Sequence, residues 1–177
     1  MGPFVSSIEK IRERARSSIE KGALTPGYRA NQTEVVKVLN EVLATEIVCA
    51  LRYKRHYYMA EGLNAEAVKE EFDEHAREER EHADMIAARI TQLNGEPDLS
   101  PEGLAERAHS DYIEGTDLQS MIREDLIAER IAIEMYGEIV RWLGDEDPTT
   151  RRLMEQVLEK EEEHAQDLVS LLGRLQQ

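Results

Sequence analysis

The chain has 177 residues, enough for one ordinary domain with a full core. Its 22 Lys and Arg against 37 Asp and Glu give a net charge of −15, which argues against nucleic-acid binding by the whole surface and suits a protein that attracts cations. No stretch approaches the roughly 18 consecutive apolar residues of a membrane span, and no apolar signal-peptide core is present, so a cytoplasmic protein is expected. The single cysteine, Cys49, excludes an internal disulfide and any Cys-x-x-Cys metal site.

Residues 1–30 are predicted to form an N-terminal extension, a short helix plus a linker. Apolar residues recur there at helical spacing, at Ile8, Ile11, Ala15 and Ile19. Ser6 with Glu9 resembles a capping box, and Thr25-Pro26-Gly27 ends the pattern. Basic residues outnumber acidic ones by three over this extension, with Lys10, Arg12, Arg14, Arg16, Lys21 and Arg29 against Glu9, Glu13 and Glu20. A mildly basic, solvated helix is the simplest interpretation.

Residues 31–177 are predicted to form a bundle of four long amphipathic helices. The expected helices span residues 33–61, 65–93, 117–143 and 147–174. The expected N-caps are Asn31 or Thr33, Asn64, Thr116 and Asp147, the last followed by Pro148 at the first helical position. The expected stops of the first three helices are Gly62, Asn94-Gly95 and Gly144.

The lengths of the connections predict how these helices are arranged. Short links join the first helix to the second and the third to the fourth, so each pair is expected to form an antiparallel hairpin. Residues 94–116 lie between the hairpins and are long enough to run the length of a helix of about 42 Å. Ser100-Pro101 suggests a short helical piece within this crossover. The sequence therefore predicts an all-α fold of two helix hairpins and one long link.

A glutamate interrupts the apolar stripe of each long helix near its middle. These glutamates are Glu46, Glu79, Glu129 and Glu161, and the second and fourth are followed three residues later by His82 and His164. On the third helix the stripe is expected to include Ile133, Tyr136 and Val140. Buried carboxylates that converge would repel one another unless cations lay among them. Four carboxylates balance two divalent ions, so a pair of metals is predicted.

The spacing of these residues supports a site with internal two-fold symmetry. Residues three apart on a helix share a face, so each Glu-x-x-His pair can bind one metal. Glu46 and Glu79 are 33 residues apart, and Glu129 and Glu161 are 32 apart. Carboxylate with imidazole suits iron or manganese, and zinc also accepts these ligands but cannot change its oxidation state. A third pair, Glu106-x-x-His109, is interpreted as a chance match in the crossover.

One further histidine, His75, is singled out from the residues alone. It lies four residues before Glu79 on the edge of the same stripe. It is interpreted either as a packed histidine or as a ligand for a third iron or along the route by which iron reaches the site.

At these motifs the chain resembles bacterioferritin, within the ferritin-like superfamily, over roughly residues 35–175. The resemblance is carried by four segments, Leu43-Ala44-Thr45-Glu46, Glu78-Glu79-Arg80-Glu81-His82-Ala83-Asp84, Leu126-Ile127-Ala128-Glu129 and Glu161-Glu162-Glu163-His164. It implies a ferritin-like four-helix bundle whose ferroxidase ligands for two iron ions per subunit are Glu46, Glu79, His82, Glu129, Glu161 and His164. Glu79 and Glu161 would bridge the metals. Tyr53 matches a tyrosine beside the site, which would be either an electron donor or a core residue.

Two departures from bacterioferritin change what the resemblance implies. The methionine that ligates haem in that family directly follows the first bridging glutamate, and here that position is Arg80, so haem is not expected. Only 13 residues follow His164, too few for the family's short fifth helix. A homo-oligomer of twelve subunits, like the shells of the Dps family, is therefore expected in preference to one of twenty-four.

The resemblance favours a ferroxidase that oxidises Fe²⁺ with O₂ or H₂O₂ and stores the product within a protein cage. Two other enzyme classes remain as alternatives, a dimanganese catalase and a di-iron peroxidase of the rubrerythrin kind, although no Cys-x-x-Cys module accompanies the latter. A DNA-binding stress-protection protein that uses the basic N-terminal extension is the non-enzymatic alternative.

Overall fold

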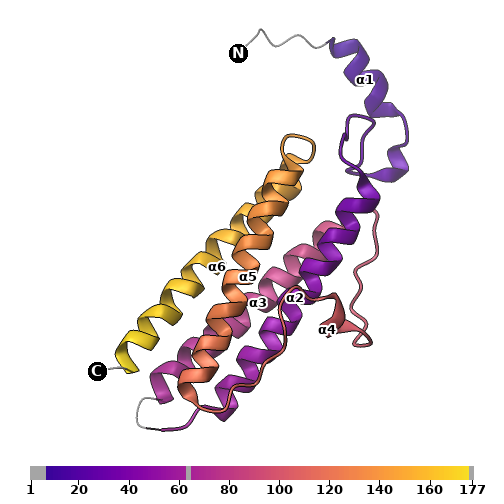
Figure 1. Ribbon diagram of the computed structural model, residues 1–177. Helices are drawn as coiled ribbons and strands as arrows, with labels where there is room; N and C mark the ends of the chain where they lie inside the picture. Colours follow the sequence, from indigo (N-terminus) through magenta and orange to yellow (C-terminus); the bar gives the residue numbers. More distant parts are fainter. Residues whose placement is uncertain (1–6, 63–64, 176–177) are drawn as a thin grey trace.

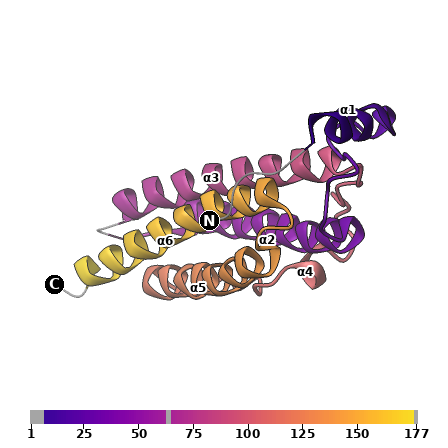
Figure 2. The same ribbon diagram turned by 90° about the horizontal axis from the view of Figure 1, so that it is seen from above.

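The computed structural model describes residues 7–62 and 65–175, and these residues form helices without any strand (Figure 1). The long helices are α2 (Gln32–Met59), α3 (Ala65–Gln92), α5 (Leu118–Leu143) and α6 (Pro148–Leu175). The short ones are α1 (Ile8–Arg16) and α4 (Leu104–Arg107). Helices α2 and α3 pack together as one hairpin and α5 and α6 as the other, as Figure 2 shows from above. The predicted bundle of two hairpins and one crossover is confirmed.

The helix starts follow from side chains that accept the first free backbone N–H groups. Asn31 caps α2, since its Oδ1 accepts from Glu34 N at 3.4 Å. The cap of α5 is Asp117, not the predicted Thr116, because Asp117 and Ser120 form a reciprocal capping box. Asp147 Oδ1 accepts from Thr150 N at 2.9 Å, with Pro148 at the first position of α6 as predicted.

Two predicted caps, Ser6 and Asn64, lie outside the described residues. For α1 the structure places the cap at Ser7, whose side chain accepts from Lys10 N. This helix ends at Arg16, so Ile19 belongs to a separate 3₁₀ turn rather than to the predicted apolar repeat.

The end of α3 shows why Asn94-Gly95 stops a helix. Asn94 adopts a left-handed conformation with φ of 55°, and Gly95 N donates to Ile90 O at 2.9 Å. A Cβ at Gly95 would lie 2.6 Å from Val36 Cγ1. Only glycine therefore allows the chain to turn this closely against α2.

The apolar core is divided into two clusters, one toward each end of the bundle. The larger cluster includes Val35, Leu39, Ile86, Tyr136, Leu143 and Met154, and we call this region the apolar end. The other includes Tyr53, Phe72, Ile122 and Leu168. On α5 the predicted stripe is partly wrong: Ile133 and Val140 are only half-buried, while their neighbours Ala132 and Ile139 are buried. Tyr136 is buried as predicted, so Ile133 and Val140 lie at the border of the buried stripe rather than at its centre.

A buried ionic network occupies the second region, which we call the polar end. Arg52 Nε donates to Asp125 Oδ1 at 2.8 Å, and His56 Nδ1 lies 2.8 Å from Asp125 Oδ2. The same two side chains reach the crossover, where Arg52 Nη1 donates to Asp111 O at 3.0 Å and His56 Nε2 lies 2.9 Å from Glu114 O. The network thus fastens the end of the long link to α2 and α5.

The N-terminal extension contacts the bundle through its linker rather than its helix. No residue of α1 is buried, whereas Leu24 packs into the cluster of the apolar end. Tyr28 Oη donates to Asp147 Oδ2 at 2.9 Å. The division of the chain at residue 30 stays a prediction. Within residues 7–62 and 65–175, no helix combines the length and apolarity needed to cross a bilayer.

Candidate metal centre

Six predicted ligands converge in the middle of the bundle, between its two apolar clusters. They come from all four long helices, and each is almost fully buried: Glu46, Glu79, His82, Glu129, Glu161 and His164. Their ligand atoms form two groups, each gathered within 4.8 Å. One group is Glu46, Glu79, His82 and Glu161, and the other is Glu79, Glu129, Glu161 and His164. Glu79 and Glu161 belong to both groups.

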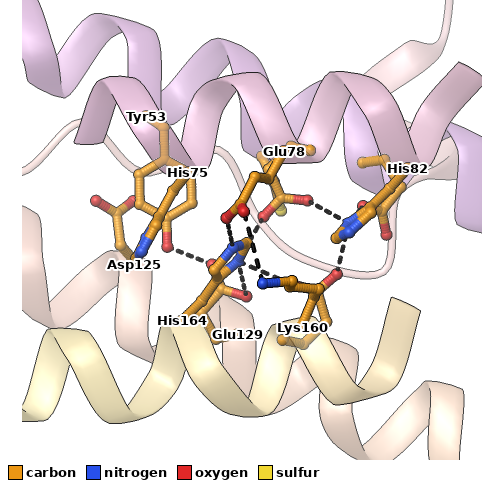
Figure 3. Close-up of polar contacts among 12 residues, drawn as sticks. Tyr53, His75, Glu78, His82, Asp125, Glu129, Lys160 and His164 are labelled. Carbon is orange, nitrogen blue, oxygen red and sulfur yellow. Dashed lines mark hydrogen bonds and ion pairs between the residues drawn. The ribbon is translucent and has the colours of Figure 1, made fainter. Parts of the chain in front are cut away.

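Each imidazole faces the carboxylates of its own group. His82 Nδ1 lies 3.1 Å from both Glu46 Oε2 and Glu161 Oε1. On the other side, His164 Nδ1 lies 3.3 Å from Glu161 Oε2 and 3.6 Å from Glu79 Oε1 (Figure 3). The two halves of the site therefore mirror each other, as the matched sequence spacings predict.

Several buried polar atoms at this centre have no hydrogen-bond partner within residues 7–62 and 65–175. They are Glu79 Oε1, both carboxylate oxygens of Glu161, and His164 Nδ1. A buried polar atom without a partner costs about 1–3 kcal/mol, and more when it is charged. Their nearest polar neighbours are the other carboxylates and imidazoles of the centre, so the residues fit a pair of bound cations. The buried Glu and His clusters are consistent with a di-metal site.

Two tyrosines hold the carboxylates that belong to one group alone. Tyr53 Oη, on α2, donates to Glu129 Oε1, and Tyr136 Oη, on α5, donates to Glu46 Oε1. Each tyrosine follows its own helix's glutamate by seven residues and bonds the glutamate of the other hairpin. The sequence analysis placed Tyr136 in the apolar stripe only. The repeat of the Glu46–Tyr53 spacing at Glu129 was the signal that could have identified it.

The charges of the centre adjust strongly when no metal neutralises them. Burial and then the repulsion from Glu79 raise the pKa of Glu46 to about 8, and burial with Glu46 and Glu129 does the same for Glu161. Burial lowers the pKa of His82, but hydrogen bonds with Glu161, Glu46 and Glu79 outweigh it and raise the pKa to about 12.

The other half of the centre shows the same substitution of protons for metal. Burial raises the pKa of Glu129, yet the neighbouring His164 lowers it to about 2. Glu129, Glu161 and Glu79 in turn raise the pKa of His164 far above its usual value, against the opposing effect of burial. In both halves the buried carboxylates thus favour the charged form of the neighbouring imidazole.

A further carboxylate, Glu78, orients one of the histidines. Its Oε2 lies 2.7 Å from His164 Nε2, which leaves His164 Nδ1 directed at the centre. Lys160 Nζ lies 3.7 Å from Glu78 Oε1. A carboxylate behind a metal-binding histidine is a common arrangement because it sets the orientation of the ring. The sequence offered no signal for Glu78 beyond its place next to Glu79.

The remaining candidate residues are not among the six that converge at the centre. Glu106 and His109 form no potential metal group among the described residues, and His109 lies instead 3.8 Å from Glu41. Arg80 is exposed, and its Nε donates to Ala76 O. The prediction about haem stays untested. His75 stacks on His164, with ring centroids 4.0 Å apart.

The four-helix bundle and its buried carboxylate–histidine cluster define a ferritin-like protein. The chain belongs to the ferritin family, whose ferritin-like domain matches residues 36–177. A bacterioferritin from Desulfovibrio desulfuricans is 26% identical over 134 residues, which cover 75% of this chain and 71% of that protein. A nutrient stress-induced DNA-binding protein from Nostoc sp. is 30% identical over 153 residues, 82% of this chain and 81% of that protein.

A solved structure shows the same fold at higher identity. It is a dodecameric thioferritin from Bacteroides fragilis, a bacterioferritin-related protein, with 35% identity and a TM-score of 0.80. The match covers 83% of this chain and 89% of that one. The predicted resemblance to bacterioferritins and their relatives is therefore confirmed.

Proposed function

We propose that this protein is a ferroxidase that binds two Fe²⁺ ions among the four glutamates and two histidines and oxidises them. The observation that carries the proposal is the set of buried Glu79, Glu161 and His164 atoms that face one another without a hydrogen-bond partner in the described part of the chain. Iron bound there would supply the electrons: two Fe²⁺ give up one each, and with two protons they reduce H₂O₂ to two waters or O₂ to H₂O₂. Bacterioferritin relatives support iron as the metal.

The residues divide into bridging and terminal ligands in this proposal. Glu79 and Glu161 would bridge the two ions, since both belong to both groups. Glu46 with His82 would complete one side, and Glu129 with His164 the other. Tyr53 and Tyr136 hold the terminal carboxylates in place through their hydroxyl groups. Each metal would keep coordination positions free for the oxidant.

We further propose that twelve subunits form the shell in which the ferric product is stored. The support is the dodecameric thioferritin, which shares the fold and 35% of its residues with this chain. The mass measured in solution should then be twelve times the 20.3 kDa of one chain. A monomer or dimer would contradict storage, because neither encloses a volume.

The proposed reaction is tested by adding Fe²⁺ aerobically and following the absorbance of the ferric product. The parent should oxidise iron rapidly, and Glu46→Ala combined with Glu129→Ala should not. A matched control is Glu106→Ala combined with His109→Ala, which removes the Glu-x-x-His pair that lies outside the centre. Circular dichroism checks that each variant folds. Equal rates for the parent and the Glu46/Glu129 variant would contradict the site.

The same samples separate the ferroxidase from the catalase. Rapid disproportionation of H₂O₂ by manganese-loaded protein, with no oxidation of iron, would instead favour the dimanganese enzyme. Carboxylate and imidazole ligands accept either metal, so only the measured reactions distinguish the two.

A further inference from the structure

A separate cluster on the outer side of the centre combines one imidazole with two carboxylates. His75 Nε2, on α3, lies 3.6 Å from Glu71 Oε1, one turn earlier, and 3.9 Å from Asp167 Oδ2 on α6. One ligand atom from each residue lies within 4.8 Å of the other two. We infer that Glu71, His75 and Asp167 form an additional divalent-cation site, which receives iron before it enters the centre. This deepens the proposed function and rests on it for the identity of the cation.

The state of His75 points to a ligand. Its side chain is only 2% exposed, and its Nε2 is the ring atom that faces both carboxylates. The other ring nitrogen, Nδ1, has no hydrogen-bond partner among the described residues. An imidazole nitrogen that faces two carboxylates is a usual ligand for a divalent metal.

The two carboxylates are available for a cation. Among the ion pairs of the described residues, His75 is the only partner of Glu71 and of Asp167. Two carboxylates with one imidazole suit Fe²⁺, Mn²⁺ or Zn²⁺, with water in the remaining positions. The negative charge of the two carboxylates would thus be balanced by a divalent ion.

The position of the cluster links solvent to the centre. Side-chain exposure falls from 52% at Asp167 to 31% at Glu71 and 2% at His75. The ring of His75 then stacks on His164 at 4.0 Å and meets Tyr53 edge-on at 5.1 Å (Figure 3). A cation held by Asp167 and Glu71 would therefore lie beside the half of the centre that contains His164.

The internal repeat of the chain does not extend to this cluster. Glu79 and Glu161 are 82 residues apart, and so are His82 and His164. The same offset relates Glu71, His75 and Asp167 to Leu153, Val157 and Met85. Apolar side chains thus occupy the corresponding places on the other half of the centre. The polar cluster occurs on one side only, as a one-sided route for a cation requires.

The inference is tested by counting the Zn²⁺ ions that the full chain binds, by titration calorimetry. The test variant is Glu71→Gln combined with Asp167→Gln, and Asp167→Gln alone changes only a half-exposed side chain if the double variant folds poorly. The matched control, Glu74→Gln combined with Glu162→Gln, removes two exposed charges from the same two helices. The parent and the control should bind three ions per chain, and the test variant two.

Iron oxidation provides the second measurement. Loss of the outer site should raise the KM for Fe²⁺ by about threefold to tenfold, because a nearby anionic site raises the local cation concentration, and should leave kcat close to the parent value. Three ions bound by the test variant, or an unchanged KM, would overturn the inference. Two ions bound by the parent would overturn it while leaving the centre intact, whereas none bound would instead refute the proposed function.

Discussion

The two ends of the bundle flank ligand residues with matched sequence spacings, yet they differ in what they bury. Glu46 and Glu129 are 83 residues apart, and this offset relates Arg52, His56 and Asp125 of the polar end to Met135, Ile139 and Val42 of the apolar end. Near the centre the two halves of the repeat carry the same residue types, because each supplies one glutamate, one Glu-x-x-His pair and one tyrosine. Farther from the centre, the corresponding positions carry different residue types. Metal binding would thus constrain the residues in the middle of the bundle, whereas it would not constrain those of the polar end and the apolar end.

The difference also shows what each end does for the fold. At the polar end the buried Arg52, His56 and Asp125 hold the crossover through Asp111 O and Glu114 O. At the apolar end packing predominates, and the exception is Arg89, whose guanidinium bonds Asp147 and Thr150 at the start of α6. Buried charges therefore appear where a connecting segment must be fastened.

The largest expected effect comes from breaking the ionic network of the polar end. Asp125→Val should destabilise the protein by about 3–5 kcal/mol, because it leaves the buried Arg52 guanidinium without its carboxylate. Arg52→Met combined with Asp125→Val introduces the residues that stand at the corresponding positions of the apolar end, Met135 and Val42. This double variant should recover much of the lost stability. Urea unfolding measures both. A double variant no more stable than Asp125→Val would show that the apolar pair cannot replace the ionic pair at the polar end.

The second effect is the pH dependence of the metal-free protein. The folded-state pKa of His82 is raised to about 12 and those of Glu46 and Glu161 to about 8, so the folded chain binds more protons than the unfolded chain between pH 5 and 8. The contribution of the two glutamates to stability is present at low pH and declines as pH rises through this window. The contribution of His82 is present below about pH 6.5 and declines as pH rises toward 12. Each extra proton changes the free energy of unfolding by about 1.4 kcal/mol per pH unit.

Bound metal should reverse this trend, because the ligands must lose those protons. Thermal unfolding should therefore show the metal-free Tm falling from pH 5 to 8, while the stabilisation by added Zn²⁺ grows. Calorimetry in buffers of different ionisation enthalpy should detect more than one proton released per chain. A metal affinity independent of pH would contradict the protonated centre.

The third effect compares the two tyrosines. Tyr53→Phe and Tyr136→Phe each free a terminal carboxylate from its orienting hydrogen bond, and each should lower the iron oxidation rate by about 10- to 100-fold. Similar losses of rate are expected for the two variants if each hydroxyl group only orients its carboxylate. A much larger loss for Tyr53→Phe, with a radical signal in the parent that this variant lacks, would instead assign Tyr53 as an electron donor.

The smallest effect is expected from the N-terminal helix. Deleting residues 1–17 removes α1, which buries no residue, so the free energy of unfolding should change by less than about 0.5 kcal/mol. Iron oxidation should also be unchanged. A gel shift of DNA by the full chain that the deletion abolishes would favour the DNA-binding alternative for this segment.

The sequence predicted the helices and the converging ligands because both depend on local periodicity. A glutamate centred on an apolar stripe must face the core, and matched spacings bring such glutamates to one level of the bundle. The ionic network was missed for the opposite reason. Arg52, His56 and Asp125 are polar residues at positions that a stripe cannot distinguish from the exposed edge, and only the crossover's path shows that they are buried.

The role of His75 at the candidate cation site could not be assigned from the sequence either. Its place on the stripe edge allowed either a packed histidine or a ligand, and the sequence could not decide between them. The decision depends on Asp167, which lies on another helix 92 residues later. The periodicity of one helix therefore cannot assign the role of such a residue, because that role depends on contacts with another helix.

Two metal ions are proposed to lie inside the bundle between Glu79 and Glu161. Anomalous X-ray scattering from crystals soaked in Fe²⁺ without oxygen, or in Zn²⁺, measures this directly. Two peaks are expected about 3.5–4 Å apart, bridged by these two carboxylates, with His82 on one ion and His164 on the other. Peaks found only between subunits, or none among the four glutamates, would contradict it.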